Sequence, residues 1–296
     1  MSVTGRLLLL ALFILPGCAS GSPAGGLDDR IWDVRAERFI SEEELLVRLR
    51  AARYRLLGEV HDHPAHHTLR AGLLAQLAPA EVFFEQFDRE HDRALREAQR
   101  AVADADALAK AGRLDKAWRW PLHRPLVETA LAARMPVRAA NLSTAETRRI
   151  AKAGVLGAED APLMEILARA EWSEARDRAM RTAIIDSHCG MLPGRAAPGM
   201  ALAQRARDAA IAQALSGSGE AVVLIAGNGH VQRDLGVPAY LAPDAAVLSL
   251  GFLETRPGET DPRDYARGAD GGPAYDAIWF TAPHPRPDPC EAFRKR

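Results

Sequence analysis

One stretch, residues 53–67 with the sequence RYRLLGEVHDHPAHH, constrains the fold more than any other because it sets a short apolar run directly before a cluster of histidines and carboxylates. The apolar run predicts a buried strand, and Gly58 permits a tight change of direction where that strand ends. Glu59, His61 and Asp62 follow at its carboxyl end. Because ligands of open α/β sheets bind at that edge, the sequence predicts a functional site there.

A helix is predicted directly after this cluster. Pro64 suits the first turn of a helix over residues 64–77, whose leucines recur at helical spacing, and His66 and His67 fall in that turn. Imidazole and carboxylate groups that lie close together can bind a metal ion or a porphyrin iron, or can act as a proton-transfer pair. The alternative is that the histidines are solvated polar residues of a turn that caps the helix.

A further carboxylate interrupts the next predicted strand, residues 81–87 (EVFFEQF). An isolated buried charge is costly, so Glu85 must be solvated, paired or bound to a cation. Its position beside the first strand makes it the expected partner of Glu59 and His61, and these groups would suit a divalent ion or a proton-transfer pair. A glutamate on the surface is the alternative.

A later predicted strand, residues 220–226, leads into Gly227-Asn228-Gly229-His230. The two glycines predict a turn with positive φ angles and a close approach of a ligand to the backbone. His230 is thereby expected at the same edge of the sheet as the first cluster. Tyr240, a little further along the chain, is a candidate to bring a phenol to that edge.

Strands alternate with helices along the chain, which predicts an α/β fold with a mostly parallel central sheet flanked by helices. Further strands are expected at residues 135–141, 247–252 and 277–281. Residues 172–188 and 198–215 predict a helical hairpin or insertion over the carboxyl ends of the strands. Gln204, Arg207 and Asp208 lie close together on its second helix, where a solvated polar stripe is the simpler interpretation.

Two other segments contain residues that could lie on the protein surface or form the wall of a ligand site. Residues 88–111 predict a charged helical segment with His91 on its surface. Trp118 and Trp120 precede a helix over residues 122–134, and they suit either the wall of a flat ligand or anchors of the core.

The amino terminus predicts export. Residues 1–17 resemble a lipoprotein signal peptide, since Arg6 precedes a short apolar run that ends in Leu-Pro-Gly before Cys18, the expected site of lipidation, for example by palmitate. Residues 18–30 then predict a flexible tether, residues 31–282 the α/β domain, and residues 283–296 a polar tail. In an oxidising compartment Cys189 and Cys290 can pair, although their spacing neither requires nor excludes a disulfide. The net charge of −1 gives no reason to expect nucleic acid as a partner.

Four blocks of the sequence together resemble a known family. They are GEVHDHPAHH at residues 58–67, FFEQ at 83–86, AQRARDA at 203–209 and AGNGHVQRDLGVPAYL at 226–241. With the lipoprotein signal, they are similar to the ChaN-like haem-binding lipoproteins, a branch of the Tiki/TraB/erythromycin-esterase-like superfamily. The resemblance implies an envelope-anchored protein, on the outer membrane of a bacterium, that binds haem reversibly as a dimer for iron acquisition, with an outer-membrane haem receptor as a possible partner.

The resemblance also implies candidate site residues. Glu59, His61, Glu85 and His230 match the site blocks of the superfamily, which serve metal-dependent proteolysis or ester hydrolysis in its enzymatic branches. Ferric haem accepts imidazole or tyrosinate ligands. The candidate haem donors are His61, His66, His67, His230, Tyr240 and Tyr265, and Arg207 or Arg233 could bind the propionates. This chain has His63 where the family commonly has asparagine.

Two hypotheses follow. The favoured one is a haem-binding lipoprotein that dimerises around its ligand and has no catalytic role. The alternative is a metal-dependent hydrolase in which Glu59, His61, Glu85 and His230 hold a divalent ion that activates water.

Overall fold

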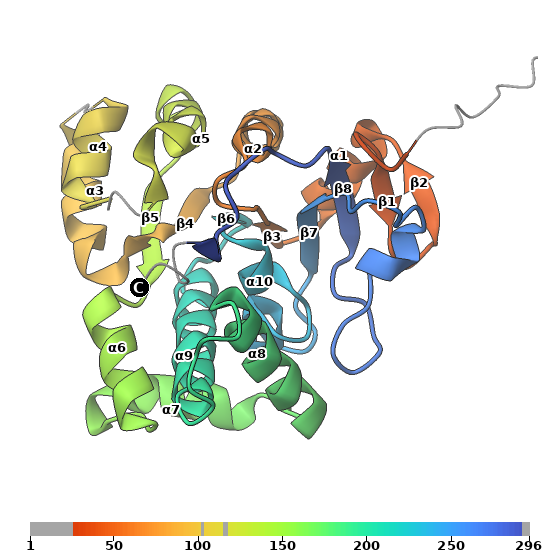
Figure 1. Cartoon of the computed structure of the whole chain (residues 1–296). Coiled ribbons are helices and arrows are strands. Elements are labelled where there is room, and N and C mark those ends of the chain that lie inside the picture. The colour runs from red at the N-terminus through yellow and green to blue at the C-terminus, as the bar shows by residue number, and fades with distance from the viewer. Residues whose placement is uncertain (1–25, 102–103, 115–117, 292–296) are drawn as a thin grey trace, which may run out of the picture.

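The computed structural model describes residues 26–101, 104–114 and 118–291 (Figure 1). The predicted signal peptide, Cys18 and most of the predicted tether lie outside these residues. Within the described part of the chain, no helix has the length and apolar character needed to cross a bilayer.

A central sheet of eight strands runs through the molecule in the order β2-β1-β8-β7-β3-β6-β4-β5. The six strands from β8 to β5 are parallel to their neighbours, whereas β1 is antiparallel to both β2 and β8. The strands are β1 (Ile31–Asp33), β2 (Arg38–Ile40), β3 (Tyr54–Leu57), β4 (Glu81–Asp88), β5 (Val137–Asn141), β6 (Val222–Ile225), β7 (Val247–Glu254) and β8 (Ala277–Thr281). The predicted fold class is confirmed.

Helices cover both faces of this sheet (Figure 1). The helices are α1 (Glu42–Ala51), α2 (Pro64–Leu77), α3 (Asp92–Arg100), α4 (Ala105–Ala111), α5 (Trp120–Ala132), α6 (Thr144–Ala153), α7 (Ala161–Arg169), α8 (Glu174–Ser187), α9 (Ala197–Ser216) and α10 (Asn228–Val231), with short 3₁₀ turns η1 (Arg89–His91), η3 (Ala158–Asp160), η4 (Val237–Tyr240) and η5 (Pro262–Tyr265). Helices α1, α2 and α5 pack on one face, and α6, α7 and α9 pack on the other. The β3 and β6 strands are therefore fully buried. The β6 strand is continuously apolar, as burial on both faces requires, and the one charged residue of β3, Arg55, donates to the carbonyl oxygens of Ala52 and Arg50.

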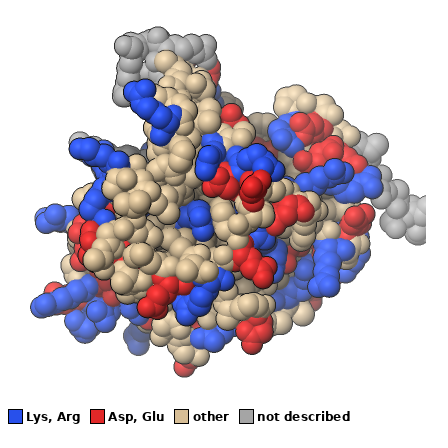
Figure 2. All heavy atoms as spheres, turned by 90° about the horizontal axis from the view of Figure 1, so that it is seen from below, with Lys and Arg blue, Asp and Glu red and all other residues tan. Residues whose placement is uncertain are grey.

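The α8–α9 pair forms the predicted helical hairpin. Alanines of α9, including Ala206 and Ala209, pack on one face of the sheet. The polar residues of α9 reach the carboxyl ends of the strands. On the outer side of these helices basic and acidic side chains are mixed, without a large area of one sign (Figure 2).

Two expectations about local structure are wrong. Gly227 and Gly229 do not adopt positive φ angles, because the chain after β6 winds into the short helix α10. Residues 88–111 do not form one continuous helical segment, since α3 ends at Arg100 and a new helix begins at Ala105 after the Asp104 cap.

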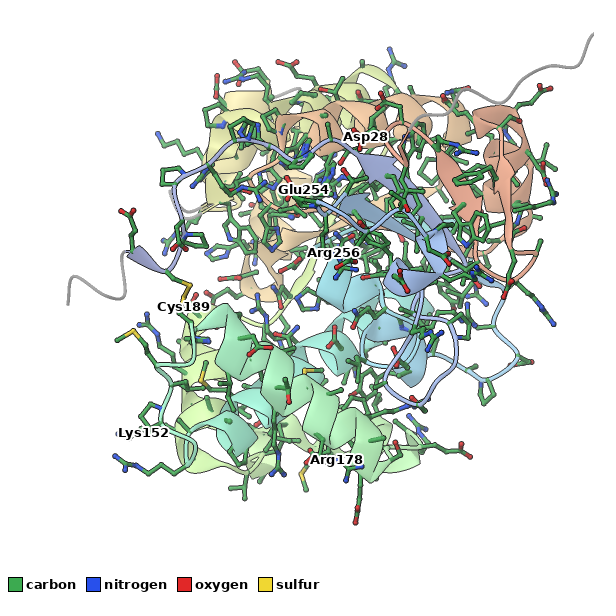
Figure 3. All side chains as sticks on the ribbon, turned by 45° about the vertical axis from the view of Figure 1, so that its right-hand side comes forward. Asp28, Lys152, Arg178, Cys189, Glu254 and Arg256 are labelled. Atoms are coloured by element: carbon green, nitrogen blue, oxygen red, sulfur yellow. A yellow bond between two sulfur atoms is a disulfide. The ribbon has the colours of Figure 1, made fainter. Side chains whose placement is uncertain are left out.

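A disulfide between Cys189 and Cys290 joins the α8–α9 loop to the carboxyl-terminal segment. The bond is visible at Cys189 in Figure 3. Before it reaches Cys290, this segment is held by Arg286, which pairs with Glu254 at the end of β7 and with Asp62 after β3. The predicted tail is thus fixed at two places near the carboxyl ends of the strands.

Candidate functional site

A cavity of about 1540 Å³ opens at the carboxyl ends of β3, β4, β5 and β6. The segments that follow β3 and β6 contribute His61 and His230, and β4 contributes Glu85. Helices α4 and α9 and the residues around Trp118 form the walls. The polar candidates from three separate sequence blocks therefore meet at one edge of the sheet, as predicted.

Glu59 is the centre of a buried polar network beneath this cavity. Its Oε1 atom lies 2.7 Å from His61 Nδ1 and accepts a hydrogen bond of 3.0 Å from Gln86 Nε2. Its Oε2 atom pairs with Arg70, whose guanidinium is fully buried, and lies 3.2 Å from His67 Nδ1. A buried carboxylate needs such partners, since leaving it unpaired would cost several kcal/mol.

Arg70 connects this network to the backbone. It donates to the carbonyl oxygens of Leu57 and His66, each at 3.3 Å, and lies 3.2 Å from His67 Nδ1. His67 Nε2 in turn donates to the carbonyl of His61 at 3.0 Å. Burial lowers the pKa of Arg70 to about 9 and that of His67 to about 3. At neutral pH Arg70 is thus cationic where it pairs with the Glu59 carboxylate, and His67 is neutral.

The second buried network is centred on His230. Its Nε2 atom lies 3.1 Å from Glu85 Oε1, and its Nδ1 atom lies 2.5 Å from Asp208 Oδ1. Glu85 Oε2 also accepts a hydrogen bond of 2.7 Å from the backbone of Gly227. Gln204 Nε2 lies 3.2 Å from both ring nitrogens of His230.

This arrangement fixes the charge of His230. Burial alone would lower its pKa, but the two carboxylates on either side raise it to about 10. Burial would likewise raise the pKa of Glu85, yet the adjacent His230 imidazolium holds it well below its usual range. His230 is therefore a protonated histidine with both nitrogens engaged, between Glu85 and Asp208.

Cationic and aromatic groups surround the remaining cavity surface. Arg207 donates from Nε to Asn141 at 3.0 Å and lies 3.7 Å from Glu85. Trp118 contacts the His61 ring edge-on, with ring centroids 4.9 Å apart. The other basic residues that line the cavity are Lys110, Arg113, Arg119 and Arg148.

Some candidate residues lie apart from the cavity. His66 accepts a hydrogen bond from the backbone of Val60 and lies 2.8 Å from Thr281 Oγ1, and burial lowers its pKa to about 3. His67 belongs to the buried Glu59 network. Tyr240 stacks on Trp172 behind α9, its hydroxyl accepts from Arg205 at 3.1 Å, and burial raises its pKa.

The two weaker candidates also lie elsewhere. Tyr265 accepts from the backbone of Arg256 at 2.7 Å and donates to that of Glu259 at 3.2 Å. Arg233 pairs with Asp276 at 2.7 Å and lines a separate groove. His63 donates toward the carbonyl of Ala282 and stacks on His66.

Several site residues were not predicted from the sequence. Arg70 lies among the leucines of α2, and only its spacing of three from His67 indicates a shared helix face. Asp208 and Gln204 share a face of α9, a pattern that in the sequence alone indicates a solvated polar stripe. His91, expected on the surface, is partly buried and lines the cavity. His123 comes from α5 and lies 3.5 Å from Glu59.

A protein-family model described as haem-binding uptake, Tiki superfamily, ChaN, matches residues 45–241. The chain belongs to the ChaN family. The matched region contains both buried networks, and the resemblance inferred from the four sequence blocks is confirmed. No curated protein matches the chain.

One solved structure shares the fold of this chain, and two others are similar to it only at low TM-scores. The structure of ChaN of Campylobacter jejuni, described with cofacial heme binding, is similar at a TM-score of 0.69 and 20% identity, over 84% of this chain and 95% of that one. The type III effector HopBA1 has a TM-score of 0.43 at 14% identity, over 81% of this chain and 92% of its own. The erythromycin esterase EreC has a TM-score of 0.41 at 13% identity, over 79% of this chain and 81% of its own.

Proposed function

We propose that this ChaN-family protein binds haem in the cavity at the carboxyl ends of β3, β4, β5 and β6, in the service of haem uptake. The observation that carries the proposal is the composition of that cavity, in which tryptophan, arginine and histidine side chains converge. The family assignment supports the same ligand.

The residues present fit this ligand. Haem is a flat apolar ring with an iron at its centre and two propionates at one edge. Trp118, Trp120 and Leu114 supply apolar wall, and the five basic residues around the cavity supply partners for carboxylates. The cavity volume of about 1540 Å³ exceeds the roughly 300–1,000 Å³ of ordinary ligand pockets, so size does not exclude a ligand as large as haem.

The wider biological role is part of the same proposal. Lipidation at Cys18 would hold the domain on the bacterial envelope, most simply at the outer membrane, where a haem receptor could supply its ligand. A homodimer that encloses haem is proposed by analogy with the cofacial haems of the Campylobacter jejuni protein.

The alternative function, hydrolysis with a divalent ion at Glu59, His61, Glu85 and His230, fits the side chains less well. His230 is protonated and uses both nitrogens for carboxylates, so it has no lone pair for a metal. The Arg70 guanidinium pairs with Glu59 and fills the place where a divalent ion would have to bind this carboxylate. Because the buried carboxylates are already neutralised by cationic side chains, a divalent ion is not needed to balance their charge.

Haem titration of the chain that begins after Cys18 tests the proposal. We expect a saturable change in the Soret band, with dimer formation followed by sedimentation on the same samples. Trp118→Ala should weaken binding because it removes a cavity wall. Trp172→Ala is a matched control, since Trp172 stacks on Tyr240 outside the cavity.

Haem that adds without saturation, or that binds equally to wild type and Trp118→Ala, would contradict binding in this cavity. Saturable binding without dimer formation would leave the cavity assignment intact and overturn only the proposed dimer.

A further inference from the structure

We infer that the groove at the β1 end of the sheet is a second binding site, which takes a small soluble organic anion with a carboxylate or phosphate group. The groove has a volume of about 730 Å³ and, among the described residues, no lining residue in common with the large cavity. It is formed by the turn after β1, by Arg233 after α10, and by the segment between β7 and β8. The inference does not depend on haem binding.

Main-chain hydrogen bonds hold the three segments of this groove together. The backbone of Val34 donates to the carbonyl of Asp276 at 3.1 Å, and that of Arg233 donates to the carbonyl of Ala274 at 2.8 Å. The β1 strand and the segment that leads into β8 therefore lie side by side (Figure 1). The lining side chains thus stand on a hydrogen-bonded backbone frame.

The charge of the groove lining favours an anion. Four arginines and two carboxylates line it, and Arg233 and Arg263 are held in ion pairs of 2.7 Å, the first with an aspartate of the groove itself. Arg35 and Arg267 are exposed, and no ion pair or side-chain hydrogen bond is found for either among the described residues. Glu37 is then the remaining carboxylate of the lining, so the unpaired part of the groove has a net positive charge.

Trp32 supplies a second, independent observation. It lines the groove and is only 8% exposed, and its buried Nε1 atom has no hydrogen-bond partner among the described residues. An indole N–H can only donate, and a buried donor without an acceptor is unfavourable. A ligand oxygen that seats against the indole, with a small adjustment of the groove wall, would supply the missing acceptor.

The lining also selects the class of ligand. Guanidinium and indole N–H groups are donors without acceptors, so they favour a carboxylate or a phosphate over an amine. The rings of Trp32 and Tyr275, together with Pro273, supply apolar surface for the rest of the ligand. The groove volume falls within the range of about 300–1,000 Å³ that is usual for small-molecule pockets. Phenyl phosphate has both the anionic and the apolar part, whereas inorganic phosphate has the anion alone.

Titration of the haem-free chain that begins after Cys18 with phenyl phosphate, followed by ¹⁵N NMR of the tryptophan indole groups, tests the inference. The chain has five tryptophans, and Trp32→Phe assigns the signal of Trp32 by its loss. We expect a saturable downfield shift of that signal, because the indole N–H gains an acceptor. Inorganic phosphate should bind more weakly than phenyl phosphate, and neutral phenol should not produce the shift.

Arg267→Gln should weaken the binding of phenyl phosphate by about tenfold or more, since it removes one charge-assisted hydrogen bond. Arg195→Gln is the matched control. Arg195 is likewise exposed and without an ion pair among the described residues, but it lies outside this groove. Equal affinities of the two variants would overturn the inference.

Other outcomes would also overturn it. One is a Trp32 signal that does not move at millimolar phenyl phosphate, and another is a set of shifts confined to Trp118 and Trp120, which line the large cavity. Binding to phosphatidylglycerol vesicles without binding to phenyl phosphate would assign the groove to a lipid surface and exclude a soluble ligand.

Discussion

Gly227 is the residue that leaves room for the His61 ring at the edge of the cavity. Its φ of −63° suits any residue, so steric contact alone requires glycine here. A Cβ atom at this position would lie 2.8 Å from Cε1 and 2.9 Å from Nε2 of His61. Glycine thus leaves the space into which the His61 ring fits.

Gly227→Ala should destabilise the fold by about 1–3 kcal/mol, as overpacking usually does, and should weaken haem binding by displacing His61. Gly229→Ala provides the control, because no atom lies within 4 Å of a Cβ added there. Urea unfolding and haem titration of both variants measure the two effects. Equal behaviour of the two variants would show that the His61 contact is unimportant.

The Glu59–Arg70 pair is fully buried, so removal of one charge leaves the other uncompensated. Glu59→Gln is expected to cost about 3–5 kcal/mol of stability. Glu97→Gln, which breaks an exposed pair with Arg93 on α3, should leave stability nearly unchanged because solvent screens that pair. Chemical denaturation measures the free energy of unfolding of both variants. A similarly small loss of stability in the two would argue against a charged Glu59–Arg70 pair.

His230 should make stability depend on pH. Its pKa is raised to about 10 in the folded protein, from about 6.5 in an unfolded chain. The stabilisation is complete below about pH 6.5 and is lost as pH rises toward about 10, because the unfolded state then binds fewer protons. The difference in Tm between wild type and His230→Gln should therefore shrink over that range. A difference that is constant or grows with pH would contradict a protonated His230.

At the residue scale, the sequence predicts the charged centres of the site but not their partners. Glu59, His61, Glu85 and His230 were placed together because each follows or ends a predicted parallel strand. Arg70 and Asp208 come from helices, and which face of a helix turns toward the site depends on how that helix packs on the sheet. Tyr240 was misplaced in the same way, since the η4 turn directs it behind α9.

At the element scale, the disulfide joins the carboxyl-terminal segment to the α8–α9 loop across 101 positions of sequence. Such a bond commonly contributes about 2–4 kcal/mol. The double variant Cys189→Ser/Cys290→Ser should be less stable by that amount in urea unfolding. Reductant should lower the stability of wild type and leave the double variant unchanged. Equal stability of the two oxidised proteins would contradict a structural role for this bond.

Apolar strands are the elements most readily predicted from this sequence. Strand β6 is a continuous apolar run that is buried on both faces. The short helix α10 was missed because its Gly-Asn-Gly sequence also suits a turn. Its conformation is fixed by tertiary contacts, since Asn228 bonds to both backbone groups of Phe252 in β7.

At the scale of the whole molecule, the fold explains why distant sequence blocks form one site. Six adjacent parallel strands bring their carboxyl ends to one edge, and helices on both faces leave that edge open to the cavity. The sequence alone predicts this arrangement in outline. It does not predict the size of the cavity, which depends on how α4, the residues around Trp118 and α9 are placed around it.

The location of iron in crystals grown with haem, determined from iron anomalous scattering, tests this account most directly. We predict an iron peak inside the cavity, beside Trp118. An iron peak outside the cavity, for example beside Tyr240 or Tyr265, would contradict the proposed binding site.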